Sequence, residues 1–326
     1  MTEINVVVWN CSGLLSSSLA QDKIDFLMAA TKPKCDIFIF IETHHKMIQD
    51  IGILHMFGAY DFIHTVASED DPYAGILVFV SKSLSISNSL ELIKGRLLNF
   101  QVQNGTRHYN ISAVYGYTGA KASIENMEKL VSEVTSSHTL SDQNLILGDF
   151  NFVHNNLDRV NESRIGMNQV DKLLSTSWVE MMGSLDISDP FRVQNPKRRM
   201  FSYIHTSHKA KSRIDRVYVN DENCQNIANY RHTPTPFVKT HRILSFNIMP
   251  ENERGPGYWK MNSSIIPDRT YGILIENIVN EISQLNLNDP IERWLVFIDA
   301  VRLETQIYCS KKKRVEKTIK KNVKTG

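Results

Sequence analysis

Apolar stretches of strand length recur along the first 250 residues, separated by polar and turn-forming residues. Seven of them predict strands: Ile4–Trp9, Asp36–Ile41, Gly75–Val80, Tyr109–Tyr115, Asn144–Leu147, Ile214–Val219 and Ile243–Ile248. Several are apolar at every position rather than at alternate positions, which is typical of strands covered on both faces. The pattern therefore predicts a core built on sheets that have further layers packed against them.

Segments with helical spacing of apolar residues lie between these stretches. The clearest are Asp22–Ala30, Ser123–Val134 and Val170–Met182, each of which gathers its apolar residues on one face. Strands and helices that interleave without a regular βαβ repeat indicate a layered α/β sandwich.

The pattern changes after Ile248. The polar, Pro- and Gly-rich stretch 250–257 is typical of a domain boundary. Two amphipathic helices are predicted beyond it, one across Leu274–Leu285 and one across Trp294–Tyr308. We expect a main domain at 1–249, a connector at 250–262 and a helical extension at 263–326. Two helices make a thin core, so we expect the extension to pack on the main domain or on a downstream region.

Composition and charge narrow the class of protein. The hydrophobic fraction of 42% is ordinary for a globular chain, and no apolar run is long enough to span a bilayer. The first residues do not resemble a signal peptide, so we expect an intracellular protein, nuclear or cytoplasmic, with reduced cysteines. The net charge of +2 combines a tail of +7 from residue 311 onward with a body of −5. That tail can contact nucleic acid or simply be a solvated end.

Polar side chains stand where several predicted strands end. Asp149 and Asn151 follow the stretch that ends at Leu147, Glu42 follows Ile41, and Asn10 follows Trp9. Carboxylate and amide oxygens are ligands that Mg²⁺ prefers, and an acid beside an amide can hold a water and a phosphate oxygen. Each of these residue types is also common in turns, so no single one decides the matter.

An acid and an imidazole near the end of the main domain complete this set. Asp215 lies at the start of a predicted strand, and His241 directly precedes another. A buried Asp there can accept a hydrogen bond from the imidazole and fix its tautomer, although Asp215 can also form a surface pair with an arginine. His44 and His45 are interpreted as loop residues beside this site, because no third ligand completes a histidine metal site.

The ordered set of short motifs resembles the endonuclease/exonuclease/phosphatase superfamily over roughly residues 4–249. The motifs are Trp9-Asn10, Glu42-Thr43, the strand that ends at Tyr115, Gly148–Asn151, Ser212–Asp215 and His241. Among its branches the chain is most similar to the apurinic-type endonuclease domain of non-LTR retrotransposons, because of Ser212–Asp215 and the segment Gly255–Asn262. The resemblance implies an α/β/β/α sandwich of two packed mixed sheets, followed here by the helical extension.

The resemblance also implies a role for each matching residue. Glu42, with Asn10 nearby, is expected to hold Mg²⁺, with Mn²⁺ as an alternative. The catalytic residues are expected to be Asp149, Asn151, Asp215, His241 and Tyr115. Asp149 activates the attacking water, Asn151 and His241 contact the phosphate, and Tyr115 lies against the phosphate or the leaving oxygen. Ser202 and Arg213 are expected on the substrate side.

Two positions depart from the family pattern. Thr240 stands where the family usually has an Asp before the final His, which removes one carboxylate and implies a weaker or shifted metal preference. Tyr117-Thr118 replaces a frequent Pro-Asn, which implies altered contacts with the substrate backbone.

These observations predict a metal-dependent endonuclease that nicks DNA. A phosphoesterase of the same superfamily acting on RNA, lipid or inositol phosphate is the first alternative, since fold alone does not set substrate. A nucleic-acid-binding derivative without catalysis is the second. The segment Gln194–Lys211 mixes basic and aromatic residues, which suits a nucleic acid, although an ordinary solvated loop has the same composition. No membrane partner and no oligomeric state are predicted.

Overall fold

The computed structural model describes most of the chain. The described residues are 2–14, 22–23, 25–26, 35–47, 57–139, 143–161, 166–205, 210–238, 240–250 and 265–284, with individual positions between 290 and 312. The chain divides into two compact units, residues 1–251 and 252–326. Among the described residues, no helix is long and apolar enough to cross a membrane.

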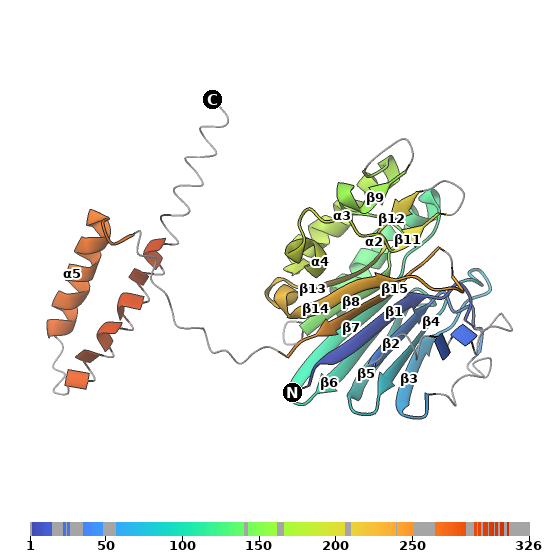
Figure 1. Ribbon diagram of the computed structural model, residues 1–326, viewed down its shortest axis with the longest axis horizontal. Coiled ribbons are helices and arrows are strands. Elements are labelled where there is room, and N and C mark those ends of the chain that lie inside the picture. The colour runs from blue at the N-terminus through green and yellow to red at the C-terminus, as the bar shows by residue number, and fades with distance from the viewer. Residues whose placement is uncertain are drawn as a thin grey trace. The chain divides into compact units, whose positions relative to one another are not determined.

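Unit 1 contains two six-stranded sheets, which Figure 1 shows packed together. The first sheet runs in the order β14 (Ile227–Thr233), β15 (Ile243–Ile248), β1 (Ile4–Asn10), β2 (Ile37–Ile41), β4 (Ile76–Ser81) and β3 (Tyr60–Thr65). The second runs in the order β10 (Ile187–Ser188), β13 (Asp215–Asn220), β8 (Gln143–Asp149), β7 (Arg107–Tyr115), β6 (Leu97–Asn104) and β5 (Ser85–Ile93). A small third sheet joins β11 (Tyr203–Ile204), β12 (Lys211–Ser212) and β9 (Arg159–Val160).

Both large sheets are mixed. In the first, β1 pairs parallel with β2 and antiparallel with β15. In the second, β8 pairs parallel with β7 and antiparallel with β13. The inner faces form one continuous apolar core, to which β1 contributes Val6 and Val8 and β7 contributes Ile111 and Ala113. Because each central strand is covered on both faces, the strands are apolar along nearly their whole length.

Two long helices cover the outer face of the second sheet. They are α2 (Ala120–Ser137) and α3 (Gln169–Ser184), and the ring of Trp178 on α3 packs on Phe150 and Phe152 just past β8. The shorter α4 (Pro190–Gln194) and the 3-10 helices η3 (Asn156–Asp158) and η4 (Asp221–Asn226) lie in the connections. On the first sheet, a separate aromatic cluster around Phe38, Phe40 and Phe57 covers the outer face.

The predicted fold class is confirmed, and all seven predicted strands are present. The prediction missed β3, β5, β6 and β14, and also the two-residue strands β9, β10, β11 and β12. β3, β5 and β14 are sheet edges whose sequences are interrupted by polar residues, so no apolar run marks them. The predicted helices Ser123–Val134 and Val170–Met182 correspond to α2 and α3. The predicted helix Asp22–Ala30 and the connector 250–257 lie mostly outside the described residues.

Unit 2 contains α5 (Arg269–Gln284), which matches the first predicted helix of the extension. The described positions between 290 and 309 are also helical. Within this unit the hydroxyl of Tyr271 and the hydroxyl of Thr305 are 2.7 Å apart, and Tyr271, Ile278 and Ile282 are buried.

Candidate active site

The pairing register places the ends of three strands of the second sheet side by side. Asp149 on β8 pairs with Tyr115 on β7 and with Asp215 on β13. Directly paired residues on neighbouring strands point to the same face of a sheet, so these three side chains form one row. On the first sheet, Asn10 pairs with Ile41, which places Glu42 just beyond it. The residues that the sequence singled out therefore meet at one end of the two sheets.

Asn10 links the two acids that come from different sheets. Its Nδ2 atom donates to Oε2 of Glu42 at 2.8 Å and to Oδ2 of Asp149 at 2.9 Å. Its Oδ1 atom accepts a hydrogen bond from the backbone N–H of Ser12 at 3.1 Å, which fixes the direction of the amide. The amide nitrogen thus donates to one oxygen of each acid, so in this geometry Asn10 orients both acids, and Oδ1 is its only atom of the kind that binds a hard cation.

Glu42 lies at the turn after β2 with a positive φ of 60°, which turns its carboxylate toward the second sheet. Burial disfavours its charge, but hydrogen bonds from His44 and Asn10 outweigh burial and hold its pKa below the ordinary value. The hydroxyl of Tyr115 also hydrogen bonds with Glu42, while burial and the neighbouring acids raise the pKa of that hydroxyl. Glu42 is therefore ionised at neutral pH and Tyr115 keeps its proton.

Asp149 is completely buried. Burial and the negative charge of Asp215 raise its pKa to about 6, against the lowering effect of His241 and the hydrogen bond from Asn10. Its Oδ1 atom accepts the backbone N–H of Asn151 at 3.0 Å. A carboxylate with a pKa near 6 can take up a proton near neutral pH, which is what a general base requires.

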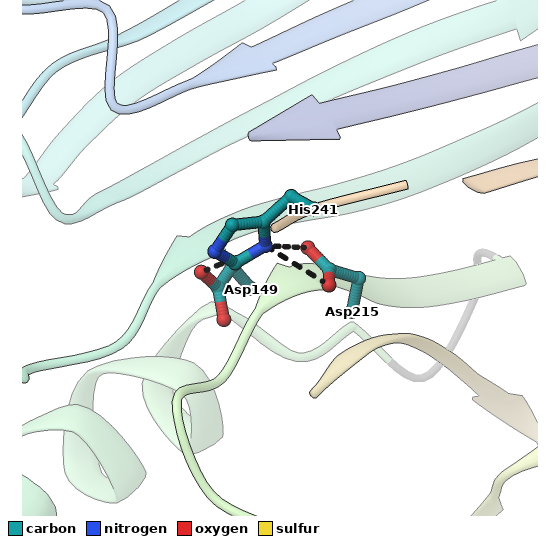
Figure 2. A group of neighbouring side chains, drawn as sticks. All are labelled: Asp149, Asp215 and His241. Carbon is teal, nitrogen blue, oxygen red and sulfur yellow. Dashed lines mark hydrogen bonds and ion pairs between the residues drawn. The ribbon is translucent and has the colours of Figure 1, made fainter. Parts of the chain in front are cut away.

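His241 lies against both acids of the second sheet, as Figure 2 shows. Its Nδ1 atom is 3.3 Å from Oδ2 of Asp215 and 3.9 Å from Oδ2 of Asp149. Burial lowers the pKa of the imidazole, but the charge and hydrogen bond of Asp215 and the charge of Asp149 raise it to about 9. The same contact holds the pKa of Asp215 below its ordinary value despite burial. His241 and Asp215 therefore form a buried ion pair at neutral pH.

Asn151 is held by its backbone and by its side chain. Its φ is 56°, a left-handed conformation that asparagine tolerates better than most residues. Its Nδ2 atom donates to the carbonyl oxygen of Gly116 at 2.8 Å, and its side chain is partly exposed. Asn151 is therefore held next to Asp149 with part of its side chain open to solvent.

The donor set fits a divalent cation. At neutral pH the site holds three largely ionised carboxylates and one imidazolium, which leaves an excess of negative charge in a buried place. Oε2 of Glu42 and Oδ2 of Asp149 are separated by no more than two hydrogen-bond lengths, since both accept from the same nitrogen. Opposite ligands of one Mg²⁺ are roughly 4 Å apart, so one acid can bind the ion directly and the other directly or through a water. Asp149, Asp215 and His241 also have ligand-type atoms within 4.8 Å of one another, of which the two carboxylates can bind a cation while the imidazole is protonated.

Comparison with known proteins agrees with this arrangement. The model of the endonuclease/exonuclease/phosphatase family matches residues 7–236. The chain belongs to this family. A relative in the frog Xenopus laevis, described as an uncharacterized 149 kDa protein of transposon TX1, is 27% identical over 204 residues. That alignment covers 60% of this chain and 15% of the transposon protein, so the chain spans only a small part of its relative. The expected resemblance to this family and to a transposon-encoded protein is thus confirmed.

Solved structures of nucleases share the fold. The AP endonuclease LMAP from Leishmania major matches with a TM-score of 0.64 at 15% identity, over 76% of this chain and 88% of that one. The 3'-5' exonuclease NExo from Neisseria meningitidis matches with a TM-score of 0.59 at 16% identity, over 76% of this chain and 100% of that one. At these identities the likeness shows a common fold, which is the fold of the family.

Ser202 and Arg213 do not lie where the sequence prediction placed them. Both are completely buried. The hydroxyl oxygen of Ser202 accepts the backbone N–H groups of Ile214 at 3.0 Å and Asp215 at 2.9 Å, so it holds the start of β13. Its hydroxyl also hydrogen bonds with the Asp215 carboxylate. Ser202 therefore supports the acid that orients His241, with no surface for a substrate.

Arg213 is enclosed by acids. It makes a two-pronged contact with Asp158, at 2.9 Å from Nε to Oδ1 and 2.8 Å from Nη2 to Oδ2, and pairs also with Asp189. Charges buried in this way are satisfied within the protein, so the direct substrate contact predicted for Arg213 is not what this geometry supports. The sequence could not show this because residues 158, 189 and 213 are far apart along the chain.

Two aromatic or cationic residues that the sequence analysis did not assign lie against the site. The ring of Tyr203 packs edge-on against His241, with centroids 4.8 Å apart. Arg96 lies under Tyr115, with Cζ 4.1 Å from the ring centroid. The only sequence signal for Tyr203 is its place beside Ser202. Arg96 has no sequence signal, because nothing in the local sequence shows that it lies close in space to the end of β7.

Thr240, which departs from the family pattern, directly precedes His241 in the chain. Its carbonyl oxygen accepts the N–H of Ile204 at 2.8 Å, which joins this segment to β11. Thr240 brings no charge, so the acids around His241 among the described residues are Asp215, Asp149 and the more distant Glu42.

Proposed function

We propose that this member of the endonuclease/exonuclease/phosphatase family is a Mg²⁺-dependent endonuclease that nicks one strand of DNA, with Mn²⁺ as a possible substitute. The single observation that carries the proposal is the link from Glu42 through Asn10 to Asp149, with Nδ1 of His241 3.9 Å from the same oxygen of Asp149. This link brings together Glu42 as the acid that would bind a divalent ion, Asp149 as the base and the imidazolium of His241, all within reach of one phosphate.

Each residue has a distinct task in the hydrolysis. A divalent cation bound by Glu42 would supply charge stabilisation to a phosphate oxygen. Asp149 accepts a proton from the attacking water, for which its pKa of about 6 is suited. His241, protonated at neutral pH, stabilises the negative charge that builds on the phosphate oxygens. Asn151 donates its remaining amide hydrogen to the same phosphate.

The partner roles follow from the same geometry. Asp215 holds the proton on His241 and sets the direction of the ring. The Tyr115 hydroxyl keeps its proton because its pKa is raised, and it can donate to the phosphate or to the leaving oxygen once it gives up its hydrogen bond to Glu42. Asn10 holds the carboxylates of Glu42 and Asp149, which come from different sheets, in place relative to each other.

DNA is the substrate that the surroundings favour. Lys197, Arg198 and Arg199 are exposed and lie just before the segment that carries Ser202 and Tyr203. Exposed basic residues close in sequence to Ser202 and Tyr203 attract a polyanionic backbone more than they attract a small phosphomonoester. One solved structure with this fold is a 3' phosphatase bound to a product DNA hairpin, and the sequence relative at 27% identity is named as a protein of a transposon.

Supercoiled plasmid tests the proposal directly. The protein of residues 1–326 with Mg²⁺ is expected to give nicked circles, and chelation by EDTA is expected to abolish them. Glu42→Gln and His241→Ala are each expected to lower the nicking rate by roughly 10²-fold or more, because each removes charge stabilisation at the phosphate. Glu128→Gln, on the exposed face of α2, is the matched control and should cleave like the wild type.

The same preparations separate the alternatives. Release of phosphate from p-nitrophenyl phosphate or inositol phosphate, without plasmid nicking, would identify a small-molecule phosphoesterase instead. Salt-dependent DNA binding with no cleavage under any divalent ion would identify a binding protein, and the catalytic proposal would then be wrong.

A further inference from the structure

Arg96 is buried against Tyr115, a residue of the candidate active site. It lies between the turn after β5 and the first residue of β6, and its side chain is 7% exposed. Its Nε atom donates to Oδ2 of Asp71 at 2.6 Å. Its Nη1 atom donates to the carbonyl oxygen of Gly116 at 2.8 Å. The planar guanidinium is thus fixed at two points, which a lysine ammonium cannot reproduce.

Two tyrosines sandwich this guanidinium. Its Cζ atom is 4.1 Å from the ring centroid of Tyr115 and 4.9 Å from that of Tyr117. The backbone carbonyl of Arg96 also accepts the N–H of Tyr115 at 2.8 Å. Tyr115 is therefore supported by Arg96 both at its backbone and under its ring. The unusual Tyr117 is part of the same packing, so the departure from the family pattern has a structural role here.

The carbonyl of Gly116 joins Arg96 to a second residue of the site. It accepts both Nη1 of Arg96 and Nδ2 of Asn151, each at 2.8 Å. The N–H of Gly116 in turn donates to the backbone oxygen of Asp149 at 2.6 Å. A Cβ atom at Gly116 would lie 2.3 Å from the carbonyl oxygen of Phe150, so only glycine fits at this position. The Gly116 peptide is therefore a junction between Arg96 and the loop that follows β8.

We propose that Arg96 is a positioning residue that sets the orientation of Tyr115 and of Asn151 together, through its two ring contacts and the Gly116 carbonyl. This inference rests on the proposed hydrolytic function for the roles of those two residues. Without the guanidinium, the Gly116 carbonyl loses one of its two donors and the Tyr115 ring loses its support. Misplacement of reacting groups by about 1 Å costs roughly 10²-fold in rate, so the effect is expected in kcat and much less in KM.

The test compares Arg96→Met with Arg96→Lys and with the control Arg231→Met, which removes one positive charge from an exposed position on β14. The first readout does not use activity. The side-chain ¹⁵N–¹H signals of Asn151, assigned with Asn151→Asp, are expected to shift in Arg96→Met and to stay in place in Arg231→Met. The second readout is plasmid nicking, where Arg96→Met is expected to lose roughly 10²-fold in kcat.

Arg96→Lys keeps the charge but not the two-pronged geometry. It is expected to recover folding stability and little of kcat, and full recovery of kcat would overturn the positioning role. If Arg96→Met does not fold, Tyr117→Leu keeps Arg96 and removes one face of the sandwich, and it is expected to shift the Asn151 signals and lower kcat to a smaller extent. Unchanged signals and unchanged kcat in the folded variants would also overturn the proposal. If the wild type never nicks DNA, the proposed function fails, while the Asn151 signals still test the positioning role.

Discussion

Asp215→Asn tests the central ion pair with a change of almost no volume. The pKa of His241 is raised from 6.5 to about 9, and Asp215 is the largest contributor that raises it. Each pKa unit corresponds to 1.36 kcal/mol, so the protonated imidazole is held with roughly 3 kcal/mol. In Asp215→Asn, no carboxylate at this position opposes the lowering of the imidazole pKa by burial, so we expect the pKa of His241 to fall below 6.5.

The loss of activity should then depend on pH. At pH 8 the wild-type imidazole is mostly protonated, whereas an imidazole with a pKa near 6 is protonated in roughly one molecule in 10². We expect the nicking rate of Asp215→Asn to be about 10²-fold below wild type at pH 8 and to approach it as the pH falls toward 6. Initial rates of plasmid nicking at saturating Mg²⁺ give this comparison, with Asp221→Asn on exposed η4 as the matched control.

Stability provides an independent measurement of the same pair. Because the folded pKa of His241 is raised, its contribution is fully present below pH 6.5 and is lost as the pH rises through about 9. Urea unfolding of the wild type should show that loss, and Asp215→Asn should lack it. NMR titration of the His241 ring in the variant decides the question, since a pKa that stays near 9 would show that Asp215 does not hold the proton.

Three further outcomes follow from the site. The nicking rate of the wild type should rise as the pH passes about 6, where Asp149 loses its proton and becomes a base, and fall as it passes about 9, where His241 loses its charge; a flat profile between pH 5 and 10 would contradict these roles. Asn10→Ala should weaken Mg²⁺ binding by roughly 10-fold in calorimetric titration, because residues that orient ligands are worth about that much, and unaltered affinity would remove its orienting role. Arg213→Met should destabilise the protein by about 3–5 kcal/mol in urea unfolding, since it leaves buried acids unpaired; normal stability with a raised KM for DNA would restore the substrate contact predicted from sequence.

The sequence predicted the parts of the site that depend on a strand and the residue after it. Asp149 and Glu42 follow continuous apolar runs, so their places at the ends of β8 and β2 could be read from the local pattern alone. The convergence of the ends followed from the family resemblance, and the structure shows it through the direct pairing of Asp149 with Tyr115 and Asp215.

The parts that could not be predicted depend on contacts between distant residues. Ser202 and Arg213 lie in the sequence close to residues of the candidate site, but their hydrogen-bond partners hold both side chains in the interior. Nothing in the local sequence distinguishes a buried arginine from one on the surface. Arg96 lies in a turn, and its local sequence does not mark it as part of the site. The pairing of β6 with β7 brings residue 96 beside residue 115. The edge strands β5 and β14 are polar because one edge of each strand has no neighbouring strand. They are therefore recognised as strands by their hydrogen bonds to the neighbouring strand and not by their own residue pattern.

The order in which the chain is made has a consequence for when the site exists. β1 at the start of unit 1 pairs with β15 near its end, and His241 directly precedes β15. A nascent chain that stops before residue 241 has Glu42, Asp149 and Asp215 but lacks the imidazole between the last two, and its first sheet is missing the strand that joins β1 to β14. Three crowded carboxylates without their counter-charge repel one another, so the centre closes only when the last strand is inserted. A chain that lacks His241 and β15 therefore cannot assemble the candidate active site, and under the proposed function we expect it to be inactive.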